Sequence, residues 1–126
     1  MKRLARYDVL VETETSTELR QCDSAISLAF TVLGKRWNGM ILGVLNTGPA
    51  SFVVLRKAVS GISDTVLSDR LSELGTAGLV HRSVVDGPPV SVSYQLTRAG
   101  VELQPVLNQL GAWASKNMHH ADGESV

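Results

Sequence analysis

Hydrophobic residues recur at helical spacing over most of the chain from residue 24 onward. A first apolar stripe ends at Gly34, and a second begins near Lys35 and runs to Leu45. The turn sequence at 46–49 separates this second helix from a short third one at about 52–58. The pattern therefore predicts three successive helices in the first half of the chain.

The segment from Ser63 to Gly78 carries the strongest helix signals in the chain. Ser63 is a typical N-cap, because its hydroxyl can accept a hydrogen bond from a free amide of the first turn, and Gly78 is a typical stop. Leu67, Leu71 and Leu74 lie at steps of four and three, so we expect them on one buried face of a helix over 64–76. The opposite face is predicted to carry short polar side chains, namely Thr65, Ser68, Asp69 and Ser72. Short side chains allow the backbone of a helix to approach a binding partner closely.

The pattern after Gly78 predicts a hairpin and then a long final helix. Residues 79–85 and 90–96 have the composition of strands, and Asp-Gly-Pro-Pro at 86–89 is typical of the turn between them. Thr97 is a predicted N-cap for a helix that extends to about residue 117. Pro105 lies inside this helix, where it removes a backbone donor, so we expect a bend or a restart there.

Successive helices, then a hairpin, then a further helix follow one another in the order of a winged helix-turn-helix, although periodicity alone does not exclude other small folds. The predicted fold class is α+β and mostly helical. Residues 1–21 are expected to form a partly ordered arm or short helix, 22–117 the winged domain, and 118–126 a disordered tail. In such a domain the helix over 64–76 enters the DNA major groove, and the wing over 80–96 contacts the flanking backbone or the minor groove.

Composition and length exclude several classes of protein. The 126 residues suffice for one domain, and a hydrophobic content of 44% is typical of a globular chain rather than a disordered one. No apolar run approaches the roughly 18 residues that a membrane span needs, and residues 1–20 lack the apolar region of a signal peptide. A single cysteine, Cys22, excludes an internal disulfide and a zinc cluster of several cysteines. We therefore expect a cytoplasmic protein without a membrane partner.

Charge is balanced over the whole chain and mildly positive in its middle. Twelve Lys and Arg offset twelve Asp and Glu, but between residues 34 and 82 six cations face only three acids. A surplus of three positive charges is compatible with nucleic-acid binding. Charge alone nevertheless favours an ordinary solvated surface.

Several short motifs occur in a fixed order between residues 22 and 113. They are Gly34-Lys35-Arg36-Trp37; Phe52 with Leu55-Arg56; Gly61-Ile62-Ser63; Leu67, Arg70-Leu71 and Glu73-Leu74; Gly78-Leu79-Val80; Val92-Ser93-Tyr94-Gln95-Leu96-Thr97 with Gly100; and Leu103, Pro105-Val106-Leu107, Leu110 and Trp113. Each motif is weak alone, but the ordered set is specific. The chain resembles the HxlR-type transcriptional regulators, a branch of the MarR-like winged helix-turn-helix family, over nearly three quarters of its length.

The resemblance implies a homodimer that is built from N- and C-terminal dimerisation helices and that binds a palindromic DNA operator to repress or activate nearby genes. The apolar stripe of the last helix is consistent with a dimer, because it is too wide for a small winged domain to cover. Two-fold symmetry would place the two recognition helices about 34 Å apart. The predicted dimerisation residues are Leu103, Val106, Leu107, Leu110 and Trp113.

The predicted DNA contacts combine a few cations with small polar residues. They are Lys35, Arg36, Arg56, Lys57, Ser63, Thr65, Ser68, Asp69, Arg70, Ser72, Arg82 and Ser91. We expect Lys35 and Arg36 to act with the free amides of a helix that they begin. By analogy with the family, several outward positions are usually Lys, Arg or Gln, and the residues there in this chain are Ser51, Thr65, Asp69, Ser72 and Ser91. We therefore expect weak non-specific binding and more dependence on short side chains and DNA shape.

Asp69 is unusual on a surface that faces phosphates. It could accept a hydrogen bond from a cytosine amino group, or it could orient Arg70 or another basic side chain. A simply solvated or paired carboxylate is the plainer interpretation.

Cys22 has two interpretations. Members of the family often sense oxidants or electrophiles through a cysteine near the first helix, and a helix N-terminus beside Cys22 would lower its thiol pKa. Asp23 next to it disfavours the thiolate, and Cys22 stands about two residues further from Trp37 than the family's usual cysteine, so an inert cysteine is the alternative. An oxidant or a small ligand is therefore a possible effector.

The chain contains no catalytic triad spacing, phosphate-binding glycine loop or paired-carboxylate site, so we expect no enzyme activity, cofactor or metal. His119, His120 and Asp122 could bind a metal, but incidental surface groups are the simpler interpretation. The alternative function is a winged-helix protein-interaction module with weak or no DNA binding. Salt separates the two, because DNA binding weakens as salt rises whereas an apolar protein contact changes little.

Overall fold

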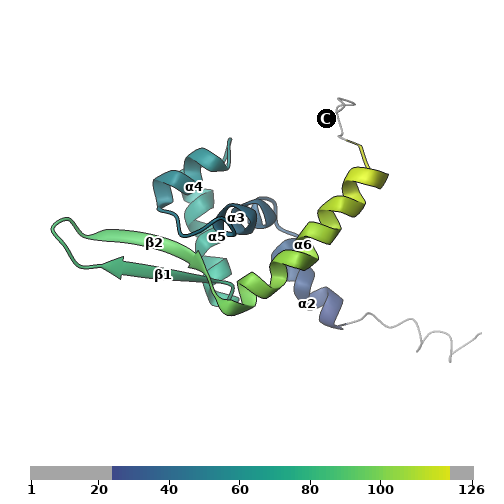
Figure 1. The fold of residues 1–126 in the computed structure, drawn as a ribbon, viewed down its shortest axis with the longest axis horizontal. Coiled ribbons are helices and arrows are strands. Elements are labelled where there is room, and N and C mark those ends of the chain that lie inside the picture. Colours follow the sequence, from purple (N-terminus) through teal and green to yellow (C-terminus); the bar gives the residue numbers. More distant parts are fainter. Residues whose placement is uncertain (1–23, 120–126) are drawn as a thin grey trace, which may run out of the picture. The chain divides into compact units, whose positions relative to one another are not determined.

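The computed structural model describes residues 24–119 (Figure 1). The chain divides into two compact units, residues 1–31 and residues 32–126, and each is considered by itself. The predicted arm at 1–21, Cys22 and residues 120–126 of the predicted tail lie outside the described residues. The helices and strands, in chain order, are α2 (Ser24–Leu33), α3 (Asn38–Leu45), α4 (Phe52–Ala58), α5 (Asp64–Thr76), β1 (Val80–Val85), β2 (Ser91–Leu96) and α6 (Arg98–Asn117). The predicted α+β, mostly helical class is confirmed.

The start of α3 differs from the prediction. The helix begins at Asn38 rather than near Lys35, because Trp37 adopts a left-handed backbone conformation with φ 84°. A residue with that conformation cannot continue a right-handed helix, so Lys35 and Arg36 lie in the turn that precedes α3. The prediction that Lys35 and Arg36 begin a helix and act together with its free amides is therefore wrong.

Two serine caps define α4 and α5. Ser51 Oγ accepts a hydrogen bond from Val54 N at 3.2 Å, and Ser63 Oγ accepts one from Val66 N at 3.1 Å. The predicted cap at Ser63 and the predicted span of α5 are both confirmed. Each cap satisfies an amide that the first turn of a helix leaves without an internal partner.

The core lies beneath α5, where the predicted leucine face packs against α3 and α4. Leu67, Leu71 and Leu74 are buried as predicted. The other buried hydrophobic residues are Ile41, Leu42, Leu45, Ala50, Leu55, Val59, Ile62 and Val80. Because α5 contributes three leucines to this core, its orientation is fixed by the same packing that holds the domain together.

The hairpin is antiparallel, and Figure 1 shows it extending away from α4 and α5. Its register pairs Val80 with Leu96 and Arg82 with Tyr94. Tyr94 also exchanges two backbone hydrogen bonds with Ala50, at 3.0 and 2.8 Å, which attaches the hairpin to the segment before α4. The base of the wing is therefore anchored to the helical part.

A single threonine joins the start of α6 to the end of α5. Thr97 Oγ1 accepts a hydrogen bond from Gly100 N at 3.1 Å, which caps α6, and it donates one to the carbonyl of Gly78 at 2.6 Å. The cap predicted at Thr97 is thus confirmed, and the same hydroxyl also holds the glycine that follows α5.

The last helix, α6, runs without interruption through Pro105, so of the two predicted outcomes the restart is excluded and the bend stays a prediction. Pro105 has no backbone N–H to donate to the carbonyl of Val101, four residues earlier in the helix. The helix packs against α3 and β2. Among residues 24–119, no helix combines the length and the hydropathy that crossing a membrane requires.

Candidate nucleic-acid interface

The outward face of α5 consists of small polar side chains. Five predicted contact residues are exposed on this face or at its N-cap, namely Ser63, Thr65, Ser68, Asp69 and Ser72. The buried leucine face orients this surface, since Leu67, Leu71 and Leu74 lie on the opposite side of the same helix. The predicted small-residue face is confirmed as an exposed surface, and its contact with DNA stays a prediction.

A groove of about 470 Å³ separates the second half of α5 from the hairpin. Its lining combines hydroxyls, one guanidinium and apolar groups, from Ser68, Leu71, Ser72, Gly75, Thr76, Val80, Arg82 and Tyr94. Arg82 and Tyr94 are cross-strand partners, and residues directly opposite in an antiparallel pair have side chains on one face. Thr76 and Tyr94 were not predicted as site residues, although strand alternation from Val80 could have indicated Tyr94.

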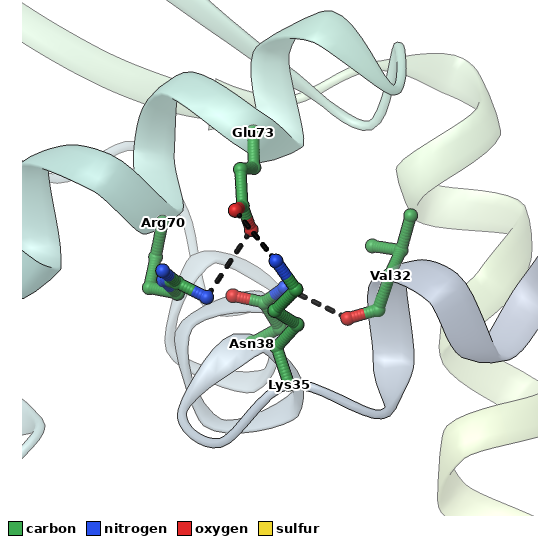
Figure 2. A network of polar contacts seen from close by, with 5 residues as sticks. All are labelled: Val32, Lys35, Asn38, Arg70 and Glu73. Carbon is green, nitrogen blue, oxygen red and sulfur yellow. Dashed lines mark hydrogen bonds and ion pairs between the residues drawn. The ribbon is translucent and has the colours of Figure 1, made fainter.

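Two of the predicted DNA-contact cations converge on one carboxylate of α5 (Figure 2). Lys35 Nζ donates to Glu73 Oε2 at 3.0 Å, and Arg70 Nη1 lies 3.3 Å from Glu73 Oε1. The Arg70 side chain is only 19% exposed. The buried Asn38 beside them donates to the carbonyl of Val32 at 2.8 Å, which ties the end of α2 to the start of α3. The structure thus gives Arg70, a predicted DNA contact, an internal ion pair with Glu73.

This cluster lowers the pKa of Glu73. The largest cause is the hydrogen bond from Lys35, and the positive charges of Arg70 and Lys35 add to it, whereas partial desolvation acts in the opposite direction. Because the pKa is lower in the folded protein than in the unfolded chain, the carboxylate stabilises the fold above the ordinary glutamate pKa. That contribution is lost as the pH falls through the lowered pKa.

A second ion pair neutralises another predicted contact. Arg56 Nη1 lies 3.2 Å from Asp64 Oδ1, which joins the end of α4 to the first turn of α5. Of the six predicted cations, three therefore have a carboxylate partner. Within residues 24–119, the other three, Arg36, Lys57 and Arg82, make no ion pair with an acid. The Arg36 guanidinium instead lies 4.4 Å from the centre of the Trp37 ring.

The tip of the wing is apolar rather than basic. Val84, Val85 and Val90 are 49%, 61% and 65% exposed, and Asp86 is the one charged residue between positions 83 and 91. Ser91, a predicted contact, is exposed beside them. The sequence analysis missed these valines as a surface, because an alternating strand pattern does not show which face remains uncovered.

The predicted dimerisation residues of α6 separate into two groups. Val106, Leu110 and Trp113 are 59%, 45% and 56% exposed. Leu103 and Leu107 instead pack against the core of their own chain. Both are only partly buried there, so they offer less surface to a partner, and their part in dimerisation stays a prediction.

The sequence and the fold match a known family of regulators. The sequence profile of the HxlR-like helix-turn-helix family matches residues 32–122. This chain belongs to that family. The family assignment and the winged helix-turn-helix fold that were predicted from the ordered motifs are both confirmed.

The relatives of this HxlR-like protein include a transcriptional regulator and a redox regulator. YodB of Bacillus subtilis (strain 168), an HTH-type transcriptional regulator, is 43% identical over 88 residues, which are 70% of this chain and 79% of YodB. The structure of reduced YodB has a TM-score of 0.71 at 39% identity and covers 77% of this chain and 95% of that chain. The redox regulator HypR in its oxidised form has a TM-score of 0.69 at 30% identity, with 74% and 96% covered. Structures of diamide-treated and quinone-bound YodB are also similar to this one.

Among residues 24–119, no group of three or more histidine, cysteine or acidic side chains is placed to hold a metal ion. Three residues were considered as metal ligands in the sequence. His119 lies after α6, and His120 and Asp122 lie outside the described residues.

Proposed function

We propose that this HxlR-like protein is a cytoplasmic, sequence-specific regulator of transcription that binds double-stranded DNA and catalyses no reaction. The observation that carries the proposal is the exposed face of α5, whose small side chains allow close approach to base edges. In the proposed complex, α5 lies in the major groove, and the hairpin contacts the flanking backbone or the minor groove. Arg82, in the groove between the two, would contact the phosphate strand.

A homodimer on a palindromic operator is the proposed functional form. Its support is the apolar face of α6 formed by Val106, Leu110 and Trp113, which the rest of the described chain leaves exposed. Pairing with the same face of a second copy would bury these side chains. The two recognition helices would then meet two half-sites on one side of the DNA.

The function is tested by incubating the protein with a randomised duplex pool near physiological salt and sequencing the duplexes that bind. We expect enrichment of a palindrome whose half-sites lie about ten base pairs apart. A protein that stays dimeric in the assay and enriches no sequence would contradict the proposal.

The salt dependence of operator binding is expected to be moderate. Three unpaired cations in each protomer make six in a dimer, and each phosphate contact contributes about −0.9 to the slope of log K against log salt, so we expect a slope of about −5. Fluorescence anisotropy between about 50 and 200 mM salt measures it. A slope of about −8 or steeper would show that the paired cations also reach phosphates.

A protein-interaction module is the second candidate function, and the wing tip favours it. Val84, Val85 and Val90 are exposed there beside Asp86, a combination that suits an apolar protein contact better than a phosphate. In this case the protein enriches no DNA sequence, and binding of its partner changes little with salt.

We further propose that Cys22 makes DNA binding sensitive to oxidants or electrophiles. The support comes from the relatives, since HypR is a redox regulator and YodB has diamide-treated and quinone-bound forms. Treatment with diamide or a quinone is expected to change operator affinity in the unmodified protein and to leave Cys22→Ser unaffected. An equal response in both proteins would assign the effect to another group.

A further inference from the structure

Asp69 is a charged residue on the outward face of α5 that no cation neutralises within residues 24–119. On a helix, side chains interact with those three and four residues away. For Asp69 these neighbours are Thr65, Val66, Ser72 and Glu73, and none of them is basic. The other acids of α5 differ, because Asp64 pairs with Arg56 and Glu73 with Lys35 and Arg70.

The adjacent cation, Arg70, is directed away from Asp69. Its guanidinium pairs with Glu73, its Nε is buried, and its side chain is 19% exposed (Figure 2). Glu73 thus holds Arg70 at the side of α5 that faces the turn before α3. The structure therefore removes one of the explanations for Asp69, namely that it orients Arg70.

A free carboxylate on this face affects DNA binding in a definite way. Phosphates repel it on every sequence, and only a base that presents an amino group to the major groove offsets the repulsion with a hydrogen bond. Thr65, Ser68 and Ser72 around it are short, so they leave room for the carboxylate to approach a base. The carboxylate therefore weakens binding to all sequences, and the hydrogen bond offsets this loss only for the few that carry the amino group. The result is a preference for those sequences.

Cytosine is the base that fits. Its N4 amino group is a donor in the major groove, whereas the adenine N6 amino group lies beside the N7 acceptor, which repels a second carboxylate oxygen. We propose that Asp69 is a specificity-determining residue that accepts a hydrogen bond from a cytosine in each half-site. This inference rests on the proposed function, because it assigns a base to the same DNA-binding surface.

The test compares the duplexes that four proteins select from one randomised pool. The proteins are the unmodified chain, Asp69→Asn, Asp69→Ala and Glu102→Gln. Glu102 lies on α6 with 67% of its side chain exposed, so Glu102→Gln removes one negative charge away from α5 and serves as the charge-matched control. We expect the unmodified protein to prefer C·G at one position of each half-site by about tenfold.

The variants should change that position alone. Asp69→Asn is expected to move the preference from cytosine to adenine, since a carboxamide bonds both N6 and N7, and Asp69→Ala to lose the preference. Glu102→Gln should select the same half-site as the unmodified protein. If both Asp69 variants instead keep that half-site and only bind all sequences more tightly, Asp69 is a solvated charge and this inference fails while the proposed function stands. If the unmodified protein enriches nothing, both fail.

Discussion

Replacing Trp113 with glutamate is expected to convert the proposed dimer to a monomer and to weaken binding to the proposed full operator by about 100-fold or more. Trp113 is 56% exposed on α6, beside Leu110 and Val106, so its substitution should leave the fold of the protomer intact. A charge in the middle of a paired apolar face would be buried without a partner. Without the dimer, each half-site contact forms independently, and the gain from linking two contacts is lost.

Light scattering for mass and anisotropy on full and half operators measure this effect. Val101→Glu is the matched control, since Val101 is 54% exposed on the same helix but lies about half a turn away from Leu110. The control should remain a dimer and bind the full operator normally. A Trp113→Glu protein that stays dimeric would show that the partner contacts another surface.

Replacing Leu67 with alanine is expected to lower the free energy of unfolding by about 3 kcal/mol, which corresponds to a fall in Tm of about 12 °C or more. Leu67 has no exposed surface, and it packs in the core beneath α5. The substitution removes three buried carbon atoms and leaves a cavity that the surrounding side chains fill only in part.

Urea unfolding at one fixed protein concentration measures the change, since the stability of a dimer depends on concentration. Val54→Ala is the control, because Val54 is 52% exposed on α4, and its change should stay within about 0.5 kcal/mol. Equal losses in the two variants would mean that the α5 leucines do not dominate the stability of the domain.

The parts of the fold that were predicted correctly are those that local signals determine. Ser63, the three leucines and Gly78 define α5 within one short segment, and the bounds of α5 agree with them. The start of α3 was missed because Gly34-Lys35-Arg36-Trp37 has an ordinary composition for the first turn of a helix. The left-handed Trp37 depends on the rest of the fold, since its ring lies close to Gly61, 24 residues along the chain, where an added Cβ would be 3.6 Å away.

The charged residues of the candidate site could be counted from the sequence, but which of them pair with one another could not be predicted. Lys35 and Glu73 pair across 38 positions, and no local pattern brings them together. For the same reason, helical periodicity placed Leu107 and Leu110 in one stripe without dividing it between the chain's own core and a partner. The small-residue face of α5 was predictable, because a helix whose buried side is known has its exposed side fixed as well.

Thr97 restrains the connection between α5 and α6, which would be more flexible without its two hydrogen bonds. Its hydroxyl bonds both Gly78 and Gly100, so α5 and α6 are fastened to each other at neighbouring ends. In a dimer that pairs through α6, a change in the crossing angle of the two α6 helices would turn both α5 helices with them. The pairing at the far end of α6 would then set the distance between the two α5 helices, and with it the half-site spacing that the dimer accepts.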